Sequence, residues 1–139
     1  MSIPVRAGDL SRSCRQLREA AESIKESPPA HLLRYYAAEC GLKHALLRRR
    51  NGRTTDDLPP QQRKGESGHD LRSLAKELRL ADADYRELRA CRRHGSGSVR
   101  HHELHEAWRY GVRLDAEEER RAVAALDRLV QWAVKEGGS

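Results

Sequence analysis

A short run between residues 100 and 105 holds the side chains with the clearest chemical potential. The run is Arg100-His101-His102-Glu103-Leu104-His105. Histidine exchanges protons near neutral pH, so it could take a proton from a ribose 2′-hydroxyl or give one to a leaving oxygen. Arginine could stabilise the negative charge of a phosphorane. The alternative interpretation is a helix whose histidines are surface or packing groups.

A metal site is a second interpretation of the same region. Cysteine and histidine, the usual zinc ligands, recur at Cys91, His94, His101 or His102, and His105. His101 and His105 are four residues apart and would share one helix face. The spacing matches no zinc-binding motif, and the run from His102 lacks the H-E-x-x-H pattern because its fifth residue is glutamate. We therefore predict no metal or other cofactor.

The chain is basic, with a formal net charge of +6, and the positive charge is concentrated before residue 115. A basic surface attracts phosphate and binds nucleic acid without sequence preference. The candidate contacts for a nucleotide or nucleic acid are Arg63, Lys64, His69, Arg92, Arg93, Arg109 and Tyr110. Tyr110 is the aromatic residue that we expect to be exposed, whereas Tyr35, Tyr36 and Trp108 fall on predicted buried faces. The alternative is that the arginines only solvate helix faces.

Length and composition favour one all-helical domain over residues 1–139. A chain of 139 residues is large enough for one hydrophobic core, phenylalanine is absent and β-branched residues are scarce. No stretch is as long and apolar as a membrane span, and early charges such as Arg6 and Asp9 interrupt any signal-peptide pattern, so we expect a soluble, cytoplasmic protein. Three cysteines without paired spacing, at apolar helix positions, predict buried reduced thiols.

Apolar periodicity predicts where the helices lie. The expected helices are, in order, about 11–26, about 30–49, one opening at 69–70, one bearing Tyr85, Leu88 and Cys91, about 99–110, and one after 115. Asp70 and Asp115 are expected N-caps, and Glu118 would complete a capping box with Asp115. Gly111 is an expected C-terminal cap, and Gly41 should permit a close helix crossing.

Two segments interrupt this helical pattern. Residues 51–68 have no periodic apolar pattern and are predicted to form a mobile loop, which is unusually long for a compact domain. Residues 95–98 read Gly-Ser-Gly-Ser and are predicted to be a flexible break.

Three segments occur in an order that resembles the HEPN superfamily of small α-helical bundles. They are residues 37–46 (AAECGLKHAL), 68–74 (GHDLRSL) and 106–111 (EAWRYG), and the resemblance covers roughly residues 30–135. The resemblance implies an up-and-down bundle of four to six helices that forms a homodimer.

The resemblance also implies a function. HEPN members that carry the aromatic-Arg-Tyr element often lack the catalytic motif, so a non-catalytic module that binds a nucleotide or nucleic acid and a partner protein is expected. The implied partners are a nucleotidyltransferase, an antitoxin or another protein of a prokaryotic toxin–antitoxin or antiphage-defence system. The alternative is a metal-independent endoribonuclease with an Arg-x4-His motif across a dimer cleft. There Arg100 would stabilise phosphate, His105 would be the acid and base, and His101 a supporting donor.

Overall fold

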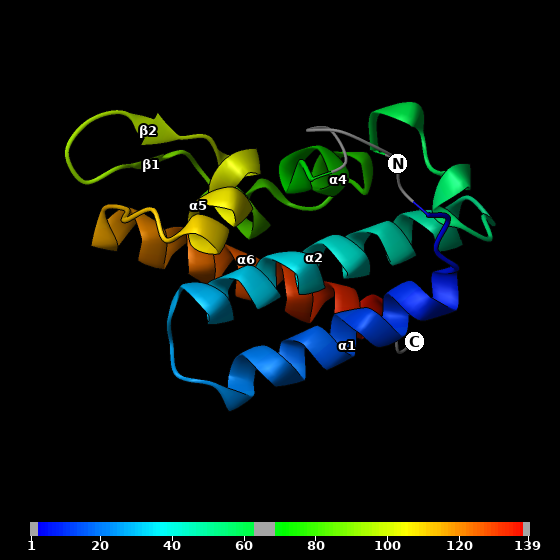
Figure 1. Cartoon of the computed structure of the whole chain (residues 1–139). Coiled ribbons are helices and arrows are strands. Elements are labelled where there is room, and N and C mark those ends of the chain that lie inside the picture. The colour runs from blue at the N-terminus through cyan, green and yellow to red at the C-terminus, as the bar shows by residue number, and fades with distance from the viewer. Residues whose placement is uncertain (1–2, 63–68, 138–139) are drawn as a thin grey trace.

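The widest apolar arc of the sequence forms the central helix of the fold. The computed structural model describes residues 3–62 and 69–137. Its α-helices are α1 (Ala7–Ser23), α2 (Pro28–Arg49), α4 (Leu71–Glu77), α5 (Leu104–Tyr110) and α6 (Ala116–Gly137). Helix α2 lies at the centre, with α1 below it and α4 and α5 above it in Figure 1. The described part of the chain is mostly helical, which confirms the predicted all-α class.

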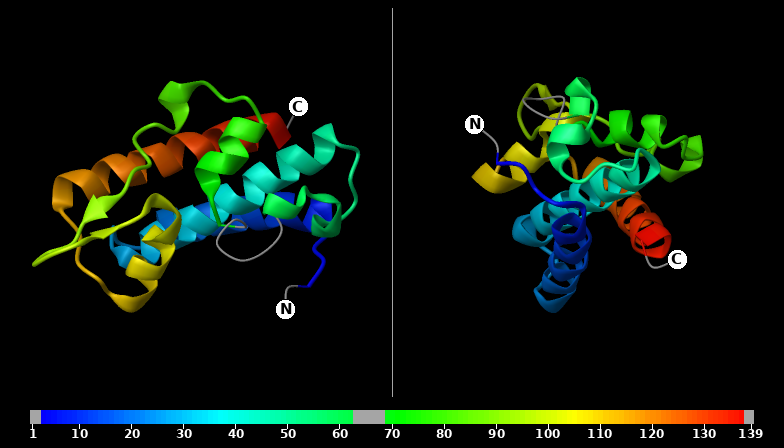
Figure 2. Two further views of the ribbon diagram at one scale, coloured as in Figure 1. Left: turned by 90° about the horizontal axis from the view of Figure 1, so that it is seen from above. Right: turned by 90° about the vertical axis from the view of Figure 1, so that its right-hand side faces the viewer.

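The three long helices do not alternate strictly in direction. Helices α1 and α2 run antiparallel, whereas α2 and α6 run parallel, as the views of Figure 2 also show. Contacts follow the same order along the pair: Arg34 of α2 bonds to Asp127 of α6, and Arg49 bonds to Glu136 nearer the ends of both helices. The expected up-and-down order is therefore wrong for α6, because α4 and then α5 bring the chain back toward the start of α2 before α6 begins.

Gly41 lets α2 approach both neighbouring long helices. A Cβ atom added at Gly41 would lie 2.5 Å from Cβ of Ala133 in α6 and 2.9 Å from Sγ of Cys14 in α1. Both distances are shorter than ordinary van der Waals contact, so no larger residue fits without movement of a helix. The predicted close crossing at Gly41 is confirmed.

Helix α6 begins at the cap that the sequence predicts. The carboxylate of Asp115 accepts a hydrogen bond from the backbone N–H of Glu118 at 3.0 Å. The Glu118 carboxylate accepts instead from the backbone N–H of Arg92 at 2.7 Å, so the second half of the expected capping box ties α6 to another segment. The apolar stripe of α6 is buried, and complete burial of Leu126 and Leu129 stabilises the fold by about 2 kcal/mol for each side chain.

The segment expected to form a helix through Tyr85, Leu88 and Cys91 does not form one. A single 3-10 turn, η3 (Asp82–Asp84), is followed by a strand, β1 (Cys91–Arg92), which pairs antiparallel with β2 (Ser98–Val99). The Gly-Ser turn closes this hairpin, with φ of 94° at Gly95 and 83° at Gly97. Leu88 and Cys91 are buried here without a helix, so their spacing alone does not require one. The glycines of the turn accept positive φ angles, which favours a hairpin at this point.

The helix expected over residues 99–110 begins later than predicted. Val99 belongs to β2, a 3-10 turn η4 (His101–Glu103) follows, and α5 starts only at Leu104. Its end is as predicted: Gly111 has a φ of 72°, and its backbone N–H bonds to the carbonyl of Ala107. Asp70 caps α4 as expected, because its carboxylate accepts from the N–H of Ser73 at 3.0 Å.

The described part of the expected 51–68 loop is packed against the helices. Two 3-10 turns, η1 (Thr55–Asp57) and η2 (Pro60–Gln62), occur where no element was predicted. Leu58 and Gln62 are buried, so side chains without helical periodicity contribute to the packed interior here. The predicted mobility stays a prediction, and residues 63–68, with the candidate contacts Arg63 and Lys64, lie outside the described residues.

Two further predictions concern the environment of the chain. Within residues 3–62 and 69–137, none of the helices combines the length and apolarity that crossing a membrane requires.

The three cysteines are free thiols, with Cys14 and Cys91 buried and Cys40 half-buried, close to the prediction of buried thiols. Burial raises the pKa of Cys91 and of Cys40 to about 12, so both thiols stay protonated near neutral pH.

Candidate functional site

Two of the histidines that the sequence singles out, His69 and His105, meet where α4 and α5 pack on α2, and a third, His101, lies beside Asp70. The rings of His69 and His105 have centroids 4.6 Å apart. Nδ1 of His101 lies 3.8 Å from Oδ1 of Asp70, the residue after His69. The fold therefore brings the segment before α4 next to η4 and α5, which follow it by about thirty residues in the sequence. We call the residues Glu39, His69 and His105, with their neighbour Tyr35, the histidine cluster.

Glu39 holds the histidine cluster together, and sequence reasoning did not identify it as a site residue. One carboxylate oxygen lies 2.8 Å from Nδ1 of His69, and the other accepts from Nζ of Lys43 at 2.8 Å. Burial alone would raise the pKa of Glu39, but the hydrogen bonds from His69 and Lys43 and the charge of Lys43 outweigh it and leave that pKa below its usual value. Glu39 is therefore a carboxylate at neutral pH. A Glu–Lys pair four residues apart inside an apolar helix was the available signal.

The contact with Glu39 defines which nitrogen of His69 carries the proton. An ionised carboxylate only accepts hydrogen bonds, so Nδ1 of His69 must be the donor. In the neutral ring, Nε2 then carries a lone pair. The side chain of His69 is 40% exposed, and the backbone carbonyl of His69 accepts a hydrogen bond from the hydroxyl of Tyr35. His69 is thus held by α2 at two points, while part of its ring stays accessible.

His105 is enclosed rather than presented at the surface. It is 4% exposed, and its ring lies 5.0 Å from that of Tyr35 and 4.6 Å from that of His69. Among the described residues, its Nδ1 has no hydrogen-bond partner. Burial, and then the charges of His69 and Arg109, lower the pKa of His105, so the ring is neutral near pH 7. Arg100, the other half of the Arg-x4-His motif, is exposed, so the two residues of the motif have different surroundings within the chain.

Arg109 and Tyr110 form an exposed pair at the end of α5. Tyr110 is 73% exposed, as predicted, and the guanidinium carbon of Arg109 lies 5.8 Å from the centre of its ring. Arg109 also donates a hydrogen bond to the hydroxyl of Tyr36. Trp108 is buried and donates from Nε1 to Glu119 at 2.9 Å, so the prediction that it is a core residue is confirmed. Helix α5 therefore has a buried face and an exposed cation–aromatic face.

The hairpin carries the candidate contacts Arg92 and Arg93. Arg92 bonds to Asp115 at 3.7 Å and to Glu118 at 3.3 Å, so acidic residues at the start of α6 balance its charge. Arg93 is exposed, and its backbone pairs with Leu114 in an isolated bridge. Arg93 is therefore the better placed of the two for an external anion.

In the described part of the chain, no group of three or more His, Cys, Asp or Glu side chains is arranged to hold a metal ion. Cys91 is buried and donates from Sγ to the carbonyl of Arg89 at 3.7 Å, whereas His94 is exposed in the hairpin. Of the residues considered for a zinc site, Cys91 thus lies in the core and His94 lies at the surface.

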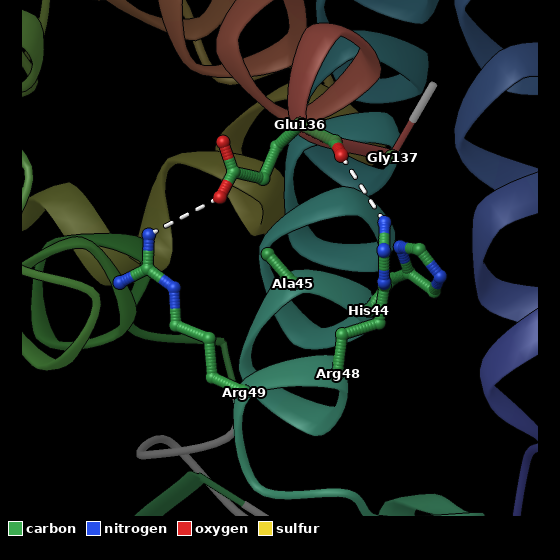
Figure 3. Close-up of a pocket in the computed structure, with 6 residues that line it drawn as sticks. All are labelled: His44, Ala45, Arg48, Arg49, Glu136 and Gly137. Carbon is green, nitrogen blue, oxygen red and sulfur yellow. Dashed lines mark hydrogen bonds and ion pairs between the residues drawn. The ribbon is translucent and has the colours of Figure 1, made fainter. Parts of the chain in front are cut away.

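A pocket of about 210 Å³ lies elsewhere, between the ends of α2 and α6 (Figure 3). Arg48 donates to the backbone carbonyl of Glu136 at 3.2 Å, and Arg49 pairs with the Glu136 carboxylate at 3.3 Å. Cations favour a helix C-terminus because the last carbonyls lack partners within the helix. Arg48 therefore caps α6 and Arg49 adds an ion pair to the same residue, so the pocket has a structural explanation.

Comparisons with known proteins identify no relative of this chain. No protein-family model, curated protein or solved structure matches the chain. The resemblance to the HEPN superfamily consequently stays a prediction from three short sequence segments.

Proposed function

We propose that the protein is a HEPN-like helical module that binds nucleic acid or a nucleotide at the end of α5. The observation that carries the proposal is the exposed Arg109–Tyr110 pair. Tyr35, Tyr85 and Trp108 are at most 7% exposed, so the fold buries these aromatic rings and leaves Tyr110 at 73%. Exposed aromatic rings flanked by arginine are the platforms on which single-stranded bases stack, at about 1–3 kcal/mol per base.

Charge around this pair supports the same ligand. The chain carries a net charge of +6, and Arg93 and Arg113 are exposed near the hairpin in addition to Arg109. When such cations bind phosphate groups, the counterions condensed on the phosphates are released. Binding of this kind weakens as the salt concentration rises. A stacking platform beside cations fits single strands better than a closed duplex, whose bases are already stacked.

The test is fluorescence anisotropy of a fluorescein-labelled single-stranded RNA of mixed sequence, titrated with protein at several salt concentrations. We expect salt-sensitive binding by the wild type, and a lower salt slope and affinity for Arg109→Ala. The matched control is Arg12→Ala, which removes one positive charge from α1, where the side chain is 63% exposed. Absence of binding at low salt, or equal losses in both variants, would overturn the proposal.

The resemblance extends the proposal to partners. A homodimer and a nucleotidyltransferase, antitoxin or other defence-system protein are the partners that it implies. Light scattering of the purified chain at several concentrations tests the homodimer, and co-purification with the products of neighbouring genes tests the second protein. A monomer that retains no neighbouring product would contradict this part.

A metal-independent endoribonuclease is the second candidate, and the Glu39–His69 contact favours it. A carboxylate that orients an imidazole is a recurring arrangement for general acid–base catalysis. Cleavage of a fluorogenic RNA in EDTA tests this function. Loss of cleavage in His69→Ala would support it, whereas loss in Arg100→Ala and His105→Ala with retention in His69→Ala would favour the Arg-x4-His motif instead.

A further inference from the structure

We propose that His69 is a proton-coupled phosphate contact: a ligand phosphate that binds between His69 and Arg109 takes up a proton at Nε2 of His69. The inference rests on the proposed function, because the phosphate belongs to the bound nucleic acid. It is carried by the tautomer that Glu39 imposes and by the closeness of His105.

The tautomer makes the proton necessary. Nδ1 of His69 donates to Glu39 at 2.8 Å, so in the neutral ring the remaining nitrogen, Nε2, is an acceptor. Oxygens of a phosphodiester are also acceptors, and two acceptors do not form a hydrogen bond. A phosphate therefore bonds to Nε2 only after a proton from solvent has been added there. No covalent bond is made or broken except this N–H bond.

Two neighbours, Glu39 and His105, make His69 the acceptor of that proton in the proposed complex. Glu39 supplies the opposing negative charge, and its 14% exposed carboxylate is already fixed by Lys43. His105 lies against His69 with its ring neutral, and two protonated rings with centroids 4.6 Å apart would repel each other. Because His105 is buried and His69 is 40% exposed, His69 is the ring that accepts the proton.

The other charged and titratable groups of this region come from each element packed on it. Helix α2 contributes Tyr35, Tyr36, Glu39 and Lys43, the start of α4 contributes Asp70, η4 contributes His101, and α5 contributes Glu106 and Arg109. Asp70 is engaged as the cap of α4 and Lys43 is paired with Glu39. Arg109 remains exposed, and its bond to Tyr36 places it beside the Tyr36 ring, whose centroid lies 6.3 Å from that of His105. In the proposed complex, Arg109 is therefore a cation at any pH near neutral, whereas His69 is a cation only after it has taken up the proton.

Isothermal titration calorimetry with the same single-stranded RNA tests the proposal. Titrations at one pH in two buffers of different ionisation enthalpy measure how many protons the complex takes up. We expect uptake by the wild type, and an affinity that rises as pH falls, by at most about tenfold per pH unit for one proton. His69→Gln should bind with no uptake, and Glu39→Gln should take up less at the same pH.

The control variant is His94→Gln, an exposed histidine of the hairpin turn, which should retain the uptake of the wild type. Because His69 is half-exposed, His69→Gln keeps the inference testable even where Glu39→Gln fails to fold. Equal binding heats in both buffers, or full uptake in His69→Gln, would overturn the inference and leave the proposed function intact. Absence of RNA binding in either buffer would instead contradict the proposed function.

Discussion

Glu39 and His69 are thirty positions apart in sequence, yet a carboxylate oxygen of Glu39 lies 2.8 Å from Nδ1 of His69. The same carboxylate binds Lys43, so one acidic side chain connects the central helix to the start of α4. Tyr35, one helical turn before Glu39, adds a second connection through the backbone carbonyl of His69. Contacts with α2 therefore determine both the position of His69 and which of its ring nitrogens donates to Glu39.

Removal of the Glu39 carboxylate should destabilise the fold. Lys43 is 9% exposed, and Glu39→Ala would leave its ammonium group buried without a partner, at a cost of about 3 kcal/mol. Urea unfolding followed by circular dichroism measures this loss. The double variant Glu39→Leu with Lys43→Met should regain most of the stability, because no unpaired charge remains. A loss below about 0.5 kcal/mol in Glu39→Ala would show that the pair is not buried in solution.

Gly41→Ala should also destabilise the protein, through packing alone. The added methyl group would meet Ala133 at 2.5 Å and Cys14 at 2.9 Å, and overpacking of this kind costs about 1–3 kcal/mol. Thermal unfolding provides the measurement. Gly8→Ala is the matched control, since a Cβ there meets nothing within 4 Å and α1 should gain helix propensity. Equal midpoints for the two variants would contradict the close crossing of α2 with α1 and α6.

Stability should fall as the solution becomes acidic. Burial is the main cause that lowers the pKa of four histidines below 6.5, namely His31, His44, His101 and His105. The unfolded chain then binds protons more readily than the folded chain, so the contribution of these groups is fully present above pH 6.5 and is lost as pH falls through the folded pKa values. Glu39, whose folded pKa is also lowered, has the same sign below pH 4.5.

Urea unfolding at a series of pH values tests this dependence. We expect a plateau above pH 7 and a decline from about pH 6.5 downward, by at most about 1.4 kcal/mol per pH unit for each proton involved. His105→Gln should make the decline shallower, because it removes the most buried of the four rings. A free energy of unfolding that stays constant or rises between pH 7 and pH 5 would contradict the burial of these histidines.

Much of the helical framework could be predicted because apolar spacing and caps are local properties. Gly111 and Asp115 end and begin helices where their chemistry requires it, and Gly41 lies at a helix crossing as its lack of a side chain suggested. The hairpin could not be recognised from spacing alone. Leu88 and Cys91 are three residues apart, which suits a helix face, but extended chain buries both as well.

The candidate site was predicted only in part, because its assembly depends on tertiary contacts. His69, His101 and His105 were singled out individually, but the contact of His69 with His105 and the approach of His101 to Asp70 depend on how α4 and α5 pack on α2. Glu39 was missed as a site residue because the sequence around a single acidic residue in an apolar helix does not show which distant residue it will contact. Residues Arg100 and His105 are close in sequence yet differ in exposure, since the turn into α5 directs His105 inward.

Tyr110 provides the most direct test of the proposed function. Anisotropy of the labelled single-stranded RNA should be compared for wild type, Tyr110→Phe and Tyr110→Ala. Tyr110 is 73% exposed, so neither change disturbs the core. Stacking predicts that Tyr110→Phe binds like the wild type and that Tyr110→Ala loses about 1–3 kcal/mol of binding free energy. Equal affinity of all three proteins, or no binding by any of them, would contradict the account.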